Sequence, residues 1–385
     1  MVGFLAIGCD QRPVLEATHP EPEVRSVAAL LLDVGAGAPD ARQSEELLFA
    51  GEPSLRSVVR EVSLGRLDLD IDVFGPYSLD EPRCLPSESG GPNPAQPNGA
   101  RVLEIIDALP QRYDHYLWLY DESAESEDCQ TWGDQGSPDF PAAFASFTRH
   151  GAISYAHELG HNLGMVHEPM LDCPSAVPLD DAAELCTARE YGNTLSFMGL
   201  GRGHPSAYQK AQLGWLRGCD GVRAQGSMCL RLLPVEMRGQ GVRLLQVPAP
   251  KKRTIPASTT SACDEIGLDF YYLELRVPDE SEAVSEAMVF VSLGPDLFDA
   301  GCGVAPYALD QRPERGAVPT MNNGGLRRGE RYEDPAGGMS IEVLELDDTG
   351  ATVSIVTTES GGEPLCLDGT AFNPTTSTSC RPSDF

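Results

Sequence analysis

The eleven residues HELGHNLGMVH, His157 to His167, constrain this chain of 385 residues more than any other stretch. On a helix, His157 and His161 lie four residues apart on one face, so both imidazoles can reach one metal ion. Glycine takes the left-handed backbone conformation at low cost, and Gly164 is therefore expected to end the helix and turn the chain towards His167. The spacing predicts a metal site built from three histidines.

The residue types at this site indicate zinc and hydrolytic chemistry. Three neutral imidazoles leave a fourth position open for water, which is the arrangement of a catalytic zinc. Glu158 lies about 100° around the helix axis from His157, so its carboxylate is expected to lie beside that water rather than to bind the metal. Zinc lowers the pKa of such a water towards about 7, and Glu158 would act as its general base. The sequence predicts peptide-bond hydrolysis with one zinc ion and no covalent intermediate.

Chance is a poor explanation of the pattern. Two histidines at this spacing are common on helices, where they usually mark a packed or solvated face. The full pattern H-E-x-x-H-x-x-G-x-x-H has a chance occurrence on the order of 10⁻⁵ at this chain's frequencies of His, Glu and Gly. A non-catalytic zinc site remains an alternative, and Glu158 counts against it because it has no structural reason to stand there.

HELGHNLGMVH is similar to the zinc signature of the metzincin metalloproteases, which also carry a methionine turn beneath the zinc. Met198, in YGNTLSFMGLG, is the candidate for that turn. The segments HPSAYQKAQLGWL, VSLGRLDLDIDVFGPY and YYLELR resemble gametolysin-type (reprolysin-like) members. The resemblance implies a secreted zinc endopeptidase with an α+β, zincin-like catalytic domain that has a mixed sheet and an active-site helix. It also implies that Gly164 and Met198 support the site.

Other residues near the signature allow more than one interpretation. Glu168 is typical of astacins, yet Met198 is followed by Gly-Leu and not by the tyrosine that astacins and serralysins use as an extra ligand. Tyr208 is interpreted as ordinary packing, with a transition-state hydroxyl as the alternative. His115 is expected to be structural. His204 is expected to lie on a surface loop, with an approach to the substrate cleft as the alternative. The subfamily stays open.

The amino-acid composition restricts the classes of binding partner that are expected. Asp and Glu total 58 against 28 Lys and Arg, which gives a net charge of −30. So acidic a surface repels phosphate backbones and anionic headgroups, which argues against nucleic acid. Asp68, Asp70 and Asp72 alternate with apolar residues and predict a solvated strand face rather than a calcium site. The expected partner is a protein or peptide substrate, with no transmembrane segment and with the oligomeric state left open.

Eleven cysteines without a C-x-x-C pair indicate disulfides and an extracellular or cell-surface location. The opening run MVGFLAIGC resembles the end of a bacterial lipoprotein signal, which makes Cys9 a candidate for lipidation. No basic segment precedes that run, so a buried strand is the alternative. Local cysteines are expected to close loops: Cys173 with Cys186, Cys219 with Cys229, and a tail tied by Cys366 and Cys380.

The pattern of predicted elements changes near residue 217. Strand and helix signals alternate before it, and short strands follow one another after it, which is typical of a β-sandwich. We expect an export signal remnant and linker over residues 1–23, the catalytic domain over 24–217, an all-β sandwich-like domain over 218–358 and a polar tail over 359–385.

Two rival functions stay open beside the peptidase. In one, the β-rich half is a surface binding or adhesion module and the zinc site is vestigial. In the other, the protein is a zinc amidase acting on a non-protein amide such as a cell-wall peptide. The general base Glu158 favours an enzyme over the binding module.

Overall fold

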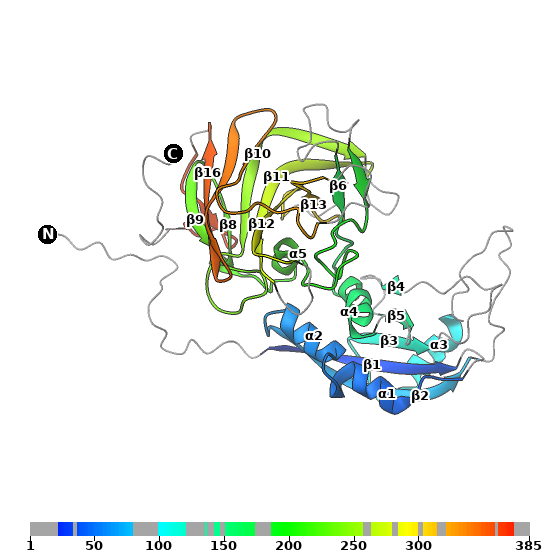
Figure 1. Ribbon diagram of the computed structural model, residues 1–385. Helices are drawn as coiled ribbons and strands as arrows, with labels where there is room; N and C mark the ends of the chain where they lie inside the picture. Colours follow the sequence, from blue (N-terminus) through cyan, green and yellow to red (C-terminus); the bar gives the residue numbers. More distant parts are fainter. Residues whose placement is uncertain are drawn as a thin grey trace. The chain divides into compact units, whose positions relative to one another are not determined.

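The computed structural model describes residues 22–33, 37–79, 99–120, 135–136, 142–146, 151–173, 186–256, 263–278, 284–298, 303–313, 321–358 and 361–372. The chain forms two compact units, Pro20–Met165 and Val166–Phe385 (Figure 1). Their boundary falls within the histidine signature. The predicted catalytic domain, 24–217, therefore includes parts of both units, and its end near residue 217 stays a prediction.

The first unit is built on a five-stranded sheet. Its strands are β1 (Glu23–Asp33), β2 (Leu67–Ser78), β3 (His115–Tyr120), β4 (Gln135–Gly136) and β5 (Ala142–Ser146). They lie in the order β2-β1-β3-β5-β4, and all neighbours are parallel except β4 and β5. The mixed sheet expected from the sequence is confirmed. β1 is buried from Val27 to Leu32 because it lies inside the sheet and is covered on both faces.

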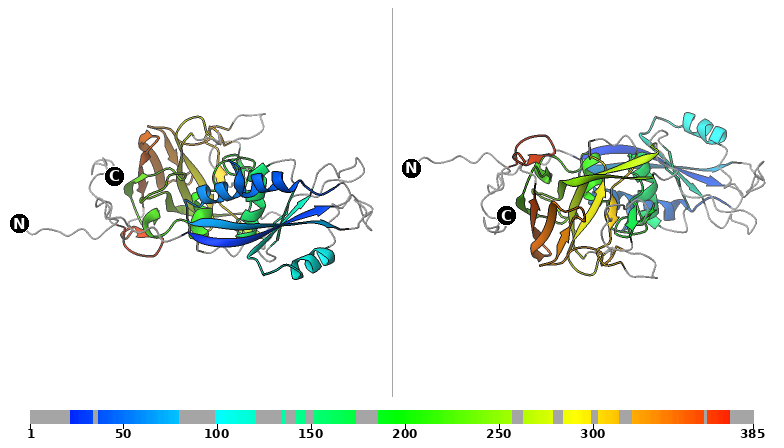
Figure 2. Two further views of the ribbon diagram at one scale, coloured as in Figure 1. Left: turned by 90° about the horizontal axis from the view of Figure 1, so that it is seen from below. Right: turned by 90° about the horizontal axis from the view of Figure 1, so that it is seen from above.

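Helices cover both faces of this sheet. They are α1 (Ala41–Glu45), a π-helical segment (Glu46–Ala50), α2 (Leu55–Val62), α3 (Gly99–Asp107) and α4 (Gly151–Asn162). Figure 2 shows α3 on the face opposite α1 and α2. Ser54 caps the N-terminus of α2, where its hydroxyl accepts a hydrogen bond from the Ser57 amide, and the helix buries Leu55, Val58, Val59 and Val62.

Strand β2 departs in one position from the expected solvated face of aspartates. Asp70 and Asp72 lie on the more exposed side, but Asp68 is buried. The Arg56 guanidinium from α2 donates to both Asp68 carboxylate oxygens, at 2.7 and 2.9 Å, and holds the pKa of that carboxyl below its usual range. Asp68 therefore anchors a helix to the sheet.

The second unit contains two sheets. An eight-stranded sheet has the order β17-β8-β10-β11-β12-β13-β6-β7, and a four-stranded sheet has the order β14-β15-β16-β9. The strands are β6 (Met170–Asp172), β7 (Thr187–Arg189), β8 (Gly221–Arg223), β9 (Met228–Leu232), β10 (Leu244–Pro256), β11 (Glu265–Arg276), β12 (Met288–Gly294), β13 (Tyr307–Leu309), β14 (Arg331–Glu333), β15 (Met339–Asp347), β16 (Gly350–Thr357) and β17 (Leu365–Cys366).

Both sheets contribute to one apolar core, which includes Leu245 and Leu273 from one and Ile341 and Val353 from the other. The all-β part expected from the sequence is thus seen as two sheets that share a core. Its predicted bounds, 218–358, stay a prediction, because the eight-stranded sheet also includes β6 and β7 from before residue 218 and β17 from the predicted tail. Helix α5 (Ala207–Gln212) belongs to the same unit. No helix among the described residues has the length and apolarity needed to cross a membrane.

The disulfides agree with one expected pair and correct another. Cys173 is bonded to Cys186, as expected. Cys219 is bonded to Cys366, so the predicted pairing of Cys219 with Cys229 is wrong, and so is that of Cys366 with Cys380. The reason is sheet topology: β17 pairs with β8 beside Cys219, whereas Cys229 lies on β9 in the other sheet. Cys229 and Cys263 are also disulfide-bonded, while Cys9 and Cys380 lie outside the described residues.

Candidate metal centre

Helix α4 places two histidines on one face. The Nε2 atoms of His157 and His161 lie 3.1 Å apart, and their rings are inclined at 83°. The helix ends at Gly164, which has a φ of +99°. There the Gly164 amide donates to His161 O at 2.9 Å and the Met165 amide to Gly160 O at 2.8 Å. These two bonds form a Schellman cap, so glycine ends the helix where the sequence predicts it.

The tautomer of His161 follows from its second ring nitrogen. His161 Nδ1 lies 3.0 Å from the main-chain oxygen of Met165. A carbonyl oxygen can only accept, so Nδ1 carries the proton and Nε2 keeps its lone pair. The cap that turns the chain therefore also fixes the tautomer in which His161 Nε2 can bind a metal ion.

His167 is oriented by two residues that precede the proposed methionine turn. Its Nδ1 lies 2.9 Å from Glu190 Oε1, and its ring packs on Tyr191 with centroids 3.9 Å apart. Because a carboxylate accepts, Nδ1 of the neutral ring is again the protonated nitrogen, and Nε2 is the nitrogen that carries the lone pair. Sequence reasoning missed both residues, whose only signal was their place shortly before Met198.

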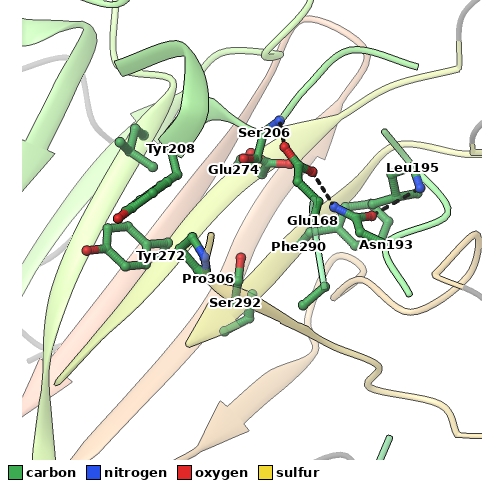
Figure 3. A pocket seen from close by; sticks show the side chains of 13 residues that line it. Glu168, Asn193, Leu195, Ser206, Tyr208, Tyr272, Glu274, Phe290, Ser292 and Pro306 are labelled. Atoms are coloured by element: carbon green, nitrogen blue, oxygen red, sulfur yellow. Dashed lines mark hydrogen bonds between the residues drawn. The ribbon is translucent and has the colours of Figure 1, made fainter. Parts of the chain in front are cut away.

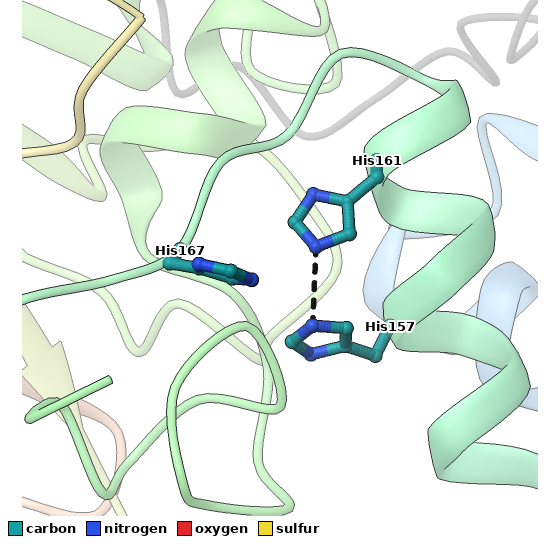
Figure 4. A group of neighbouring side chains, drawn as sticks. All are labelled: His157, His161 and His167. Atoms are coloured by element: carbon teal, nitrogen blue, oxygen red, sulfur yellow. Dashed lines mark hydrogen bonds between the residues drawn. The ribbon is translucent and has the colours of Figure 1, made fainter. Parts of the chain in front are cut away.

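The three histidines form one group. One ring nitrogen from each of His157, His161 and His167 lies within 4.8 Å of the others, and each residue is partly buried (Figure 4). Two of the three have a fixed tautomer that leaves Nε2 able to ligate. A set of neutral imidazole nitrogens suits zinc, so the residues present fit the metal that the sequence predicts.

Glu158 lies beside this group on α4. The residue is only 3% exposed, and its Oε1 is 3.9 Å from His157 Nε2. The carboxylate therefore lies near the ring nitrogen of His157 that faces His161. A buried carboxylate at that place is suited to proton transfer.

Met198 is fully buried in a tight turn. Its amide donates to Ser196 Oγ at 3.0 Å, and its carbonyl accepts from the Glu168 amide at 2.9 Å. The turn is thus tied to the residue that directly follows His167. Support of the zinc by the Met198 side chain stays a prediction.

Glu168, which the sequence left without a role, is buried and joins three segments. Its Oε1 accepts from the Ser206 amide at 2.7 Å and from Gln209 Nε2 at 3.0 Å, and its Oε2 accepts from Asn193 Nδ2 at 2.7 Å. Figure 3 shows this carboxylate between Ser206 and Asn193, on the wall of a small pocket that Tyr208 also lines. Burial raises the pKa of Glu168, and the Ser206 amide opposes that rise.

The remaining candidates, Tyr208, His204 and His115, are all buried. Tyr208 packs edge-on against Tyr272, with ring centroids 5.0 Å apart, which supports the packing interpretation. The sequence predicted His204 on a surface loop, and this prediction is wrong, because His204 is only 3% exposed. Its Nδ1 lies 2.8 Å from Lys210 Nζ, so the two buried polar groups pair with each other. His115 is buried in β3, as expected.

Comparison with known proteins adds little. No protein-family model and no curated protein matches the chain. Among solved structures it is similar to archaemetzincin from Methanopyrus kandleri, at 15% sequence identity and a TM-score of 0.27, over 51% of this chain and 97% of that one. So weak a likeness assigns neither a fold nor an activity, and the site's chemistry rests on its own residues.

Proposed function

We propose that this protein is a zinc endopeptidase of the metzincin class, closest to the gametolysin type. His157, His161 and His167 are the zinc ligands, and Glu158 is the general base. The observation that carries the proposal is the convergence of three imidazole nitrogens within 4.8 Å of one another, with the buried Glu158 carboxylate 3.9 Å from one of them.

The chemistry divides between the metal and this chain. Zinc, when bound, supplies a Lewis acid that acidifies a water and polarises a peptide carbonyl. Glu158 takes a proton from the water and delivers it to the leaving amine nitrogen, so no covalent intermediate is needed. Met165 O and Glu190 accept hydrogen bonds from Nδ1 of His161 and of His167, so the lone pair of each ring is on Nε2, the nitrogen that would bind the metal.

Export belongs to the same proposal. Every described cysteine is in a disulfide, and disulfides persist in oxidising compartments. We place the protein outside the cell or on its surface. An intact mass of the exported protein tests lipidation at Cys9 by the presence or absence of the added acyl mass.

The test is cleavage of a quenched peptide library by the zinc-loaded protein, by chelated protein and by Glu158→Gln. Wild type is expected to cut, chelated protein to be inactive until zinc is restored, and Glu158→Gln to lose roughly 10²- to 10⁴-fold in kcat while keeping its zinc. Glu104→Gln, which changes an exposed carboxylate on α3, is the matched control.

Other results would favour the rivals. Zinc-loaded protein that cuts no peptide but releases an amine from cell-wall material, shown by product mass spectrometry, would be an amidase. Zinc-loaded protein that cuts neither would support the binding module.

A further inference from the structure

The side chain of Gln209 holds the main chain next to His167. Gln209 lies on α5 and is 1% exposed. Its Oε1 accepts from the Val166 amide at 2.9 Å, and its Nε2 donates to the Val166 carbonyl at 2.8 Å. One side-chain amide thus satisfies both main-chain groups of the residue before the third histidine.

Gln209 also holds Glu168, the residue after His167. Gln209 Nε2 also donates to Glu168 Oε1 at 3.0 Å, and the Asn193 amide donates to the Glu168 carbonyl at 3.0 Å. Glu168 Oε2 accepts from Asn193 Nδ2 at 2.7 Å. Val166 and Glu168 are therefore both fixed, to α5 on one side and to the loop of Met198 on the other.

This arrangement contrasts with the surroundings of the imidazole ring. The His167 and Glu190 side chains are 22% and 36% exposed, so water competes for their hydrogen bond. Glu168 and Gln209 are each 1% exposed, and breaking one of their bonds leaves a buried polar group unsatisfied. The buried contacts are thus the more rigid of the two sets.

We propose that Gln209, acting with Glu168, is the positioning residue for the third zinc ligand. It touches no metal and sets the main-chain position from which His167 reaches the ion. The inference rests on the proposed zinc site, because it assumes that His167 ligates. Loss of Gln209 is expected to weaken zinc binding by 10- to 100-fold, the range typical of residues that orient ligands.

The test measures the zinc dissociation constant of the full chain by competition with a chromogenic chelator. Gln209→Ala is compared with wild type and with Gln212→Ala, a change on the same helix that removes a bond to Tyr208 Oη and none to Val166 or Glu168 among the described residues. Gln209→Ala should weaken binding 10- to 100-fold and Gln212→Ala less than about 2-fold. Gln209→Ala binding zinc as tightly as wild type would overturn the inference.

A double variant separates positioning from general destabilisation. In the His167→Ala background, Gln209→Ala should weaken zinc binding no further, because the ligand that it positions is already absent. An equal loss in both backgrounds would show that Gln209 acts through overall structure, and would overturn the inference. Wild type that binds no zinc would instead refute the proposed function itself.

A reciprocal exchange tests Glu168. In Glu168→Gln the new amide oxygen is needed by the two donors at Oε1, so the new NH₂ group faces Asn193 Nδ2, which is also a donor. The bond to Asn193 is then lost, and zinc binding should weaken. Adding Asn193→Asp restores a donor and acceptor pair and should recover at least half of the lost affinity on a logarithmic scale. A double variant weaker than Glu168→Gln alone would contradict the assigned role.

Discussion

Glu190 Oε1 lies 2.9 Å from His167 Nδ1, which makes Glu190 the carboxylate partner of the third histidine. Such a partner fixes the tautomer and strengthens the imidazole as a ligand. We expect Glu190→Ala to weaken zinc binding by 10- to 100-fold and Glu190→Gln to weaken it less, since an amide oxygen still accepts. Equilibrium competition for zinc measures both. Equal affinities for Glu190→Ala and wild type would remove Glu190 from the site.

Gly164 gives a prediction about the end of α4. At a φ of +99° a residue with a side chain is strained, although no atom would lie within 4 Å of an added Cβ. Gly164→Ala should therefore cost about 1 to 2 kcal/mol of folding free energy through the backbone alone. Gly164→Asn should cost less, because asparagine tolerates positive φ. Urea unfolding of the zinc-free protein measures both, and Gly164→Asn costing as much as Gly164→Ala would contradict the backbone explanation.

Local contacts explain what could be predicted from the sequence. The facing pair His157 and His161 and the turn at Gly164 depend on helix periodicity and on one cap, all within a few residues. Long-range pairing explains what could not. Glu190 and Gln209 meet the histidine segment only because the chain returns to it after β7 and again in α5. No spacing rule identifies such partners.

The same reasoning explains the cysteine error. Cys219 and Cys229 are near in sequence, but β8 and β9 enter different sheets. Cys366 lies near Cys219 because β17 pairs with β8, with Cys366 opposite Val222. Sequence proximity predicts disulfides only when no sheet boundary lies between the two cysteines.

His115 predicts how stability depends on pH. It is buried, and neither ring nitrogen has a hydrogen-bond partner among the described residues. Burial lowers the pKa of His115, Arg25 lowers it further, and Asp114 opposes them. The unfolded imidazole, with a pKa near 6.5, then takes up a proton before the folded one does. The free energy of unfolding should therefore fall as pH falls below about 6.5, by at most about 1.4 kcal/mol per pH unit from this group.

The measurement compares urea unfolding of wild type and His115→Leu between about pH 5 and 8 in the presence of a chelator. The variant should show the shallower loss of stability on the acid side, because it has no imidazole to protonate in the unfolded chain. Parallel curves would mean that other groups control the acid limb.

The disulfides Cys219–Cys366 and Cys173–Cys186 should differ in their contribution to stability. Cys219–Cys366 spans 147 residues and Cys173–Cys186 spans 13. Chain entropy in the unfolded state then gives about 5 kcal/mol for the first and about 3 kcal/mol for the second. Replacing both cysteines of each pair by serine should destabilise the protein more for the long loop, by a difference of about 2 kcal/mol in urea unfolding. Equal losses, or a larger loss for the short loop, would show that native-state strain or residual unfolded structure outweighs loop length.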